Sequence, residues 1–109
     1  MDEADDLLTI SREVTDGGTV RLKLAGEIDA ATVPLVEDAL SAAFDEGFTQ
    51  LVVDLSAVNF MDSSGLNVLI VVRNTLDDRG LKLIIAGVSD QVRRLFELSG
   101  LTTAFTFAS

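Results

Sequence analysis

Residues 51–66 read LVVDLSAVNFMDSSGL, and this stretch decides the fold. Its first five residues form an apolar run broken only by Asp54, which is typical of a central strand covered on both sides. Asp62-Ser63-Ser64-Gly65-Leu66 then opens a second apolar segment, over 64–78. The length of that segment and its polar end at 77–80 favour a helix over another strand. A buried strand followed directly by a helix predicts an α/β sheet.

The flanking sequence continues this alternation. Val20, Leu22 and Leu24 alternate with charged residues, as in a half-buried strand, and Asp16-Gly17 before them is a hairpin signal. The remaining expected elements are strands over 7–14, 19–25, 81–87 and 103–107 and helices over 30–46 and 89–99. Pro34 and Gly47 mark the two ends of the first of these helices, and Ser89 or Asp90 caps the second. The expected order is two strands followed by three helix–strand units. It predicts one domain, with a mixed, mostly parallel sheet, an antiparallel edge strand and packed helices. Residues 1–6 are expected to be a flexible tail and residues 7–109 the domain.

Composition excludes several classes of protein. The 109 residues include no His and no Cys, which excludes a Ser-His-Asp triad, a Cys nucleophile and a His/Cys zinc site. We therefore expect no enzyme, no metal and no cofactor. No apolar run approaches 18 residues, and the start, MDEADD, is unlike a secretory signal. These features predict a cytoplasmic protein without a membrane partner.

The negative charge is concentrated in the first part of the chain. Residues 1–64 contain 14 acidic and 3 basic residues, a net charge of −11, against +1 for residues 65–109. Such an acidic half argues against binding the phosphates of a nucleic acid. Two interpretations stay open, namely simple solubility and steering toward a basic partner protein.

Four stretches match a known family in order: Gly26-Glu27-Ile28-Asp29, Leu51-Val52-Val53-Asp54-Leu55, the segment FMDSSGL over 60–66, and VRRLFELSGL over 92–101. On these residues the chain resembles a STAS domain, the sulphate-transporter and anti-sigma-factor-antagonist fold. It is most similar to the stand-alone bacterial anti-anti-sigma factors. The resemblance covers nearly the whole chain, and its third stretch is the most specific.

The resemblance implies a phosphorylation switch at Ser63. In that family the first serine of the motif is phosphorylated by an anti-sigma factor that is also a serine kinase and brings ATP and Mg. The unphosphorylated protein binds the anti-sigma factor and frees the sigma factor, and a PP2C-type phosphatase restores binding after phosphorylation. One departure is Asn67, where the family often has glycine.

Several residues near Ser63 have two interpretations. A serine at a helix N-terminus is a favourable address for a phosphate, but Asp and Ser are also good N-caps. Asp62 orients the Ser63 hydroxyl, accepts its proton or caps the helix. Gly65 allows close approach of a partner or packs against the sheet. Asp29, with Glu27, forms an acidic rim or begins the helix over 30–46.

The helix over 64–78 carries more apolar residues than one buried stripe requires. Positions 65, 68, 69, 72 and 76 form a face toward the sheet, which leaves Leu66, Ile70 and Val71 as surplus. They form an exposed interface or are buried under the helix over 89–99. The expected partner-binding surface consists of Glu27, Asp29, Asp62, Ser64, Gly65, Leu66, Asn67 and Ile70.

Two alternatives to a switched interaction protein use the same residues differently. A ligand-sensing or stressosome-type STAS module would use the same crevice for a small molecule. A receiver-like protein would use Asp54 as an acylphosphate site, but needs an adjacent acidic pair and a late lysine. The stretch over 26–29 has no adjacent pair and no lysine follows Lys82, so Asp54 is interpreted as a turn or cap residue at a strand end.

Overall fold

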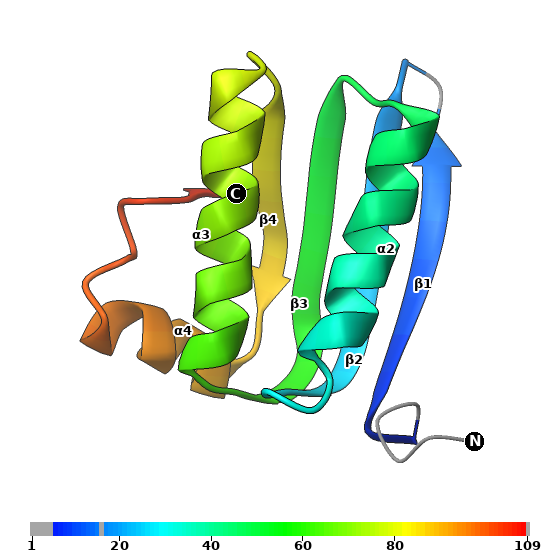
Figure 1. Cartoon of the computed structure of the whole chain (residues 1–109). Helices are drawn as coiled ribbons and strands as arrows, with labels where there is room; N and C mark the ends of the chain where they lie inside the picture. The colour runs from blue at the N-terminus through cyan, green and yellow to red at the C-terminus, as the bar shows by residue number, and fades with distance from the viewer. Residues whose placement is uncertain (1–5, 16, 109) are drawn as a thin grey trace.

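The structure is a computed structural model that describes residues 6–15 and 17–108. A five-stranded sheet has the order β1-β2-β3-β4-β5, in which β1 is antiparallel to β2 and the other neighbours are parallel. The expected fold class and order of elements are confirmed (Figure 1). The strands are β1 (Leu8–Thr15), β2 (Thr19–Ile28), β3 (Gln50–Met61), β4 (Lys82–Val88) and β5 (Thr106–Phe107), and the helices are α2 (Val33–Glu46), α3 (Ser63–Asp78) and α4 (Asp90–Leu98).

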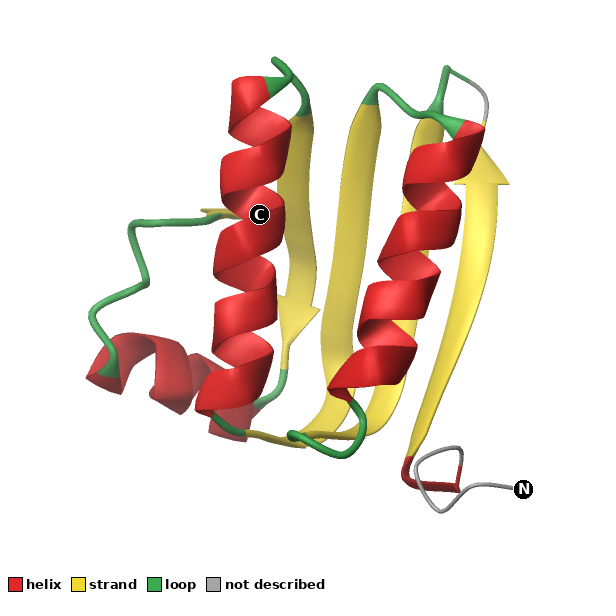
Figure 2. Ribbon diagram, viewed as in Figure 1, coloured by secondary structure: helices red, strands yellow, loops and turns green. Residues whose placement is uncertain are grey.

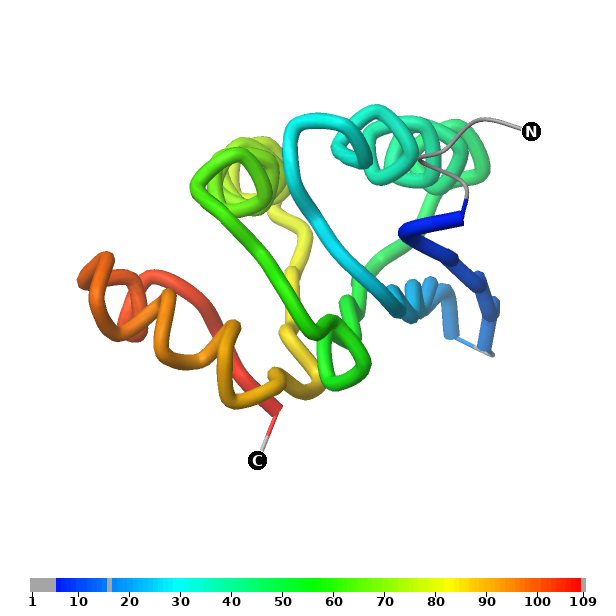
Figure 3. The backbone as a smooth tube through the Cα atoms, turned by 90° about the horizontal axis from the view of Figure 1, so that it is seen from below, coloured from blue at the N-terminus to red at the C-terminus, as the bar shows by residue number. Residues whose placement is uncertain are grey.

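Helices α2 and α3 lie side by side in front of the sheet (Figure 2). Helix α4 packs against β3 and β4 on the side of the molecule away from α2, and the view from below separates the three helices (Figure 3). Within the part of the chain that the structure describes, no helix is long and apolar enough to cross a membrane.

The core lies between β2, β3 and the two front helices. All five residues of 51–55 are buried, as the continuous apolar run predicts. Leu22 and Leu24 of β2 line the same interior as Val36 of α2 and Leu69 of α3. The alternating pattern over 19–25 therefore turns its apolar side to the helices and its charged side away from them.

Several element boundaries differ from the sequence predictions, and β2, for example, continues to Ile28, three residues beyond its predicted end. Helix α2 begins at Val33 rather than at residue 30, because Asp29 and Thr32 fold the chain into a turn first. Strand β3 continues to Met61, six residues beyond the predicted end, with register shifts against β2. Strand β5 is only Thr106–Phe107, because residues 102–105 turn and Phe105 packs on Phe96.

Gly26 allows β1 and β2 to pair closely. Its φ is +123°, and a Cβ at this position would lie 2.1 Å from the backbone oxygen of Leu7. Any side chain would therefore force the two strands apart where Gly26 faces Leu8. The predicted tail at 1–6 and hairpin at Asp16-Gly17 fall largely outside the described residues, since 1–5 and 16 are not described.

Candidate functional site

Ser63 is the first residue of α3 and lies at the carboxyl-terminal end of β3. Asp62 is the N-cap of α3, and its Oδ1 accepts hydrogen bonds from the Ser64 amide at 2.9 Å and from the Ser64 hydroxyl. Ser63 is exposed, and its side chain has no hydrogen bond to any residue of 6–15 or 17–108. The capping interpretation of Asp62 is confirmed, but the serine that Asp62 orients is Ser64.

The turn before α2 reaches the same edge of the sheet. Thr32 is fully buried, and its hydroxyl donates to the Glu27 carbonyl and accepts from the Asp29 amide, each at 2.9 Å. The Asp29 carboxylate accepts from the amides of Ala31 and Thr32 at 2.9 and 3.2 Å. Asp29 therefore shapes the turn and does not begin the helix. The sequence reasoning missed Thr32, whose only local signal is its place three residues after Asp29.

One backbone hydrogen bond joins this turn to the serine segment. The Asp62 amide donates to the Ile28 carbonyl at 3.2 Å. The structure thus brings Asp29 and Asp62 to neighbouring strand ends, whereas the acidic rim expected from the sequence consists of Glu27 and Asp29. Glu27, however, alternates with the core residue Ile28, so its side chain lies on the opposite face of the sheet from α2 and α3.

Gly65 and Leu66 are buried. A Cβ on Gly65 would lie 2.7 Å from Met61 Cγ and 2.9 Å from Ile28 Cγ2, so the glycine allows α3 to pack closely on the strand ends. Leu66 is only 4% exposed and belongs to the core. The burial of these two residues argues against the direct contact with a partner that was expected from the sequence.

The burial of Leu66 has an identifiable cause. Leu66, Ile70 and Arg73 follow one another at helical spacing and share one flank of α3. On that flank Arg73 donates to the Ala104 carbonyl at 3.0 Å, so the chain segment after α4 covers it. Ile70 is half-buried there, and of the three surplus residues only Val71, at 62% exposed, is an open apolar side chain.

An apolar groove of about 500 Å³ separates α2 from α3. Val33, Glu37 and Phe44 line it from α2, and Asn67, Val68 and Val71 line it from α3. Ser64 also lies at its wall, so the groove extends from the serine segment along the open side of α3. Asn67 is exposed at this position.

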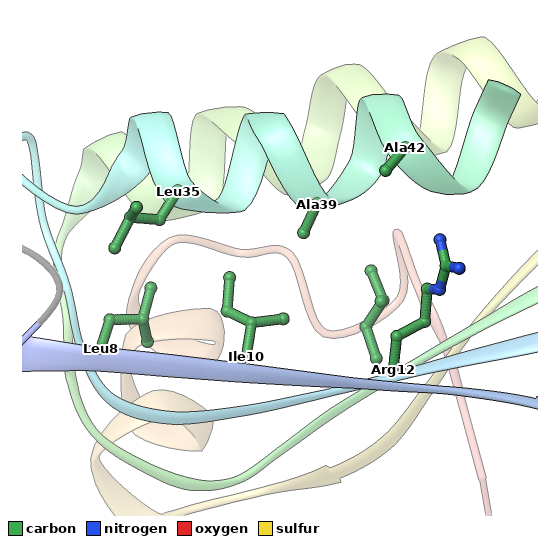
Figure 4. A pocket seen from close by; sticks show the side chains of 7 residues that line it. Leu8, Ile10, Arg12, Leu35, Ala39 and Ala42 are labelled. Atoms are coloured by element: carbon green, nitrogen blue, oxygen red, sulfur yellow. The ribbon is translucent and has the colours of Figure 1, made fainter.

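A second groove, of about 370 Å³, lies on the other flank of α2, against β1 (Figure 4). Ala39 and Ala42 face Ile10 and Arg12 across it, and Arg12 pairs with Glu46. The small side chains of α2 leave this space open. The groove lies on the far side of α2 from α3 and is not part of the serine site (Figure 1).

Asp54 is a structural residue of β3. It is 8% exposed, accepts from Arg21 at 2.9 Å and from the Ser56 amide and hydroxyl at 2.9 and 2.6 Å. Burial raises the pKa of Asp54, but the hydrogen bonds from Ser56 and the Arg21 charge outweigh that effect and lower the pKa below its usual value. Asp54 lies within β3, at a register shift between β3 and β4. The interpretation of Asp54 as a residue at a strand end is therefore wrong.

The described residues contain no group of three or more acidic side chains placed to hold a metal ion. The site consists of an exposed serine hydroxyl at a helix N-terminus, a capped serine beside it, two carboxylates on neighbouring strand ends and an apolar groove. Such an arrangement offers a nucleophilic oxygen and a contact surface.

Comparison with known proteins agrees with this geometry. The STAS domain family model matches residues 10–109. The Anti-sigma-B factor antagonist of Staphylococcus aureus (strain NCTC 8325 / PS 47) is 39% identical over 80 residues, which is 73% of this chain and 74% of the relative. An anti-sigma factor antagonist from Mycobacterium paratuberculosis has a similar crystal structure, with a TM-score of 0.84, 32% identity and coverage of 94% of this chain and 86% of that chain.

The Bacillus cell fate determinant SpoIIAA in its phosphorylated form is also similar in structure. Its TM-score is 0.71 at 26% identity, over 93% of this chain and 92% of that chain. The four matching stretches, the sheet order and the family match over nearly the whole length lead to one conclusion: this chain belongs to the STAS domain family.

Proposed function

We propose that this protein is an anti-sigma factor antagonist whose binding is switched off by phosphorylation of Ser63. The observation that carries the proposal is the difference between the two serines. Asp62 holds the Ser64 hydroxyl, whereas the Ser63 hydroxyl is exposed at the start of α3. The names of the relatives and the phosphorylated form of SpoIIAA support it.

In the proposed reaction the partner supplies the catalytic machinery. An anti-sigma factor with serine-kinase activity binds ATP and Mg. The Ser63 Oγ forms a bond to the γ-phosphorus as the bond from that phosphorus to the bridging oxygen of ADP breaks. The hydroxyl proton passes to a base on the kinase, and ADP leaves. A PP2C-type phosphatase returns Ser63 to its free form by hydrolysis.

The partner would bind the serine segment and the open side of α3. Asn67 and Val71 provide an exposed amide and an exposed apolar side chain beside the groove. Asp29 and Asp62 supply negative charge at the rim, which would guide a basic surface into register. Gly65 and Leu66 contribute indirectly, because they hold the start of α3 against the strands.

The phosphate would reject the partner by its charge. It adds about −1.5 to −2 at neutral pH, next to Asp62 and close to Asp29. In the free protein water and the N-terminal dipole of α3 accommodate this charge. In the complex the same charge would be desolvated against a surface that fits a neutral hydroxyl, which is costly without a paired cation.

One observation favours a second function, a ligand-sensing or stressosome-type module. The groove between α2 and α3 is large enough for a small apolar molecule and ends at Ser64. In this alternative the groove's occupant, not the modification of Ser63, would control the partner.

The test begins with intact mass spectrometry. The protein is incubated with ATP, Mg and each candidate anti-sigma kinase of its own genome, and the phosphorylated site is located by fragmentation. We expect one phosphate on Ser63 and none in Ser63→Ala. Phosphate on Ser64 that persists in Ser63→Ala would contradict the assignment.

Calorimetry then tests the electrostatic switch. Ser63→Asp should bind the anti-sigma factor at least about tenfold more weakly than wild type, and Ser63→Ala should bind normally. Asn74→Asp is the matched control, because it adds one carboxylate to an exposed position of the same helix, far from Ser63. Equal affinity of Ser63→Asp and Asn74→Asp would refute rejection by charge and favour the ligand-sensing alternative.

A further inference from the structure

Strand β3 extends beyond its neighbour β4. The last residue pair between them is Leu55 with Val88, while β3 continues to Met61. From Ser56 onward, the edge of β3 on this side has no strand partner among the described residues. The backbone that leads into Ser63 therefore needs another source of hydrogen bonds on that edge.

Gln91 of α4 supplies these hydrogen bonds at Met61, the last residue of β3. Its Oε1 accepts from the Met61 amide at 2.9 Å, and its Nε2 donates to the Met61 carbonyl at 3.2 Å. One carboxamide thus replaces the hydrogen bonds that a neighbouring strand would make. Gln91 is in the first turn of α4, where long side chains point back toward the helix start and can reach a chain beyond it.

The opposite edge of the same short segment is held by β2. In a strand, successive residues direct their backbone groups to opposite edges. The Met61 groups accordingly meet Gln91, and the next amide, that of Asp62, meets the Ile28 carbonyl at 3.2 Å. The chain is therefore clamped from both sides immediately before Ser63.

This clamp makes no hydrogen bond to the Ser63 hydroxyl and acts on Ser63 through the chain on either side of it. Met61 is 1% exposed, and its side chain supports α3 at Gly65. The Ser63 hydroxyl has no hydrogen bond of its own within 6–15 and 17–108, so its position follows from where Met61 and Asp62 are held. Displacement of Met61 would displace the hydroxyl with it.

We propose that Gln91 is a positioning residue for the phosphorylation of Ser63, acting through its two hydrogen bonds to Met61. The inference rests on the proposed function of Ser63 as the phosphoacceptor. In-line transfer requires the oxygen and the phosphorus to be held at close range, and small misplacements of a reacting group reduce the rate strongly. The partner contacts on α3 and at Asp29 do not include Gln91, so its loss affects turnover and leaves the affinity unchanged.

The experiment compares Gln91→Met with wild type and with Glu97→Gln. Met has about the length of Gln but has no carboxamide to hydrogen-bond to the Met61 backbone. Glu97 is another exposed residue of α4 and serves as the control position. Hydrogen exchange of the Met61 amide is measured on each free protein. Steady-state phosphorylation is measured with the anti-sigma kinase that modifies wild-type protein, and thermal unfolding is recorded alongside.

In Gln91→Met we expect the Met61 amide to exchange at least about tenfold faster, while the Asp62 amide keeps its protection. We expect kcat to fall by about tenfold with KM within about twofold of wild type. Glu97→Gln should match wild type in all three measurements.

Each other outcome overturns a defined part of the reasoning. Unchanged exchange of Met61, or faster exchange with unchanged kcat, would overturn the role of Gln91 alone. A loss of kcat that tracks a lower unfolding temperature would replace positioning by simple destabilisation. If no kinase modifies wild-type Ser63, the proposed function fails, and the role of Gln91 fails with it.

Discussion

Substitution of Leu66 by alanine distinguishes between two roles of this side chain, packing in the core and contact with a partner. Leu66 is 4% exposed and packs in the core, so Leu66→Ala should destabilise the fold and leave the exposed contact surface intact. Substitutions of this kind cost about 2–5 kcal/mol, from lost transfer free energy and the cavity left behind. This cost is a large part of the about 5–15 kcal/mol that stabilises a typical domain.

The expected change in unfolding temperature follows from the chain length. Unfolding entropy of about 2.1 cal/mol/K per residue gives about 0.23 kcal/mol/K for 109 residues. A loss of 2–5 kcal/mol therefore lowers the melting temperature by about 9–22 °C. The assay is thermal unfolding followed by circular dichroism, with urea unfolding to obtain the free energy directly.

Asn67→Ala is the matched control, since Asn67 is the next residue along the helix and is exposed. It should shift the melting temperature by less than about 3 °C. Below its melting temperature, Leu66→Ala should bind the anti-sigma factor within about twofold of wild type. Normal stability of Leu66→Ala combined with faster dissociation from the partner would refute the burial argument.

Three further predictions follow from the same structure. Asp54→Asn should lower the free energy of unfolding by about 1.5–3 kcal/mol at pH 7. Because the pKa of Asp54 is lowered in the folded state, its stabilisation is present above the unfolded pKa of about 3.9 and is lost as pH falls through the folded value, so urea unfolding at pH 3 should show a smaller difference. Gly26→Ala should lower the free energy of unfolding by about 3 kcal/mol or more, because it adds a clash to the backbone strain. Gly47 has a φ of +82° and open space around it, so Gly47→Ala should lower the free energy of unfolding by backbone strain alone, about 1–2 kcal/mol in the same assay. Asp29→Asn keeps the acceptor for the Ala31 amide but removes the charge, so surface plasmon resonance should show slower association at low salt and a weaker salt dependence.

The order of elements and most of the core were predictable because they follow from local patterns. The alternation over 19–25 and the apolar run over 51–55 each specify a strand and its buried side without reference to the rest of the chain. Pro34 near the start of α2 and Ser89 before α4 also mark the helix ends that the structure has.

The errors concern features set by distant parts of the chain. The sequence leaves two interpretations of Leu66, because a helix with apolar residues on most sides does not reveal which flank another segment covers. Here the cover comes from residues near Ala104. The extension of β3 to Met61 depends on Ile28 and Gln91, which lie about 30 residues away on either side. Gln91 satisfies backbone groups of Met61 that no local sequence pattern identifies, and Thr32 has only a weak local signal, its place three residues after Asp29.

The order of strands in the sheet equals their order in the chain, and this has a consequence for synthesis on the ribosome. Each strand pairs with the one made before it, so the sheet can grow at a single edge as the polypeptide emerges. No strand has to wait for a later one to fill a gap, and loop closure is limited to one helix at a time. Gln91 is synthesised after the serine segment that follows β3. The two hydrogen bonds from Gln91 to the Met61 backbone can therefore form only after α4 has been made. Before α4 is available, the segment that leads to Ser63 is held only on its β2 side, through the hydrogen bond from the Asp62 amide to the Ile28 carbonyl.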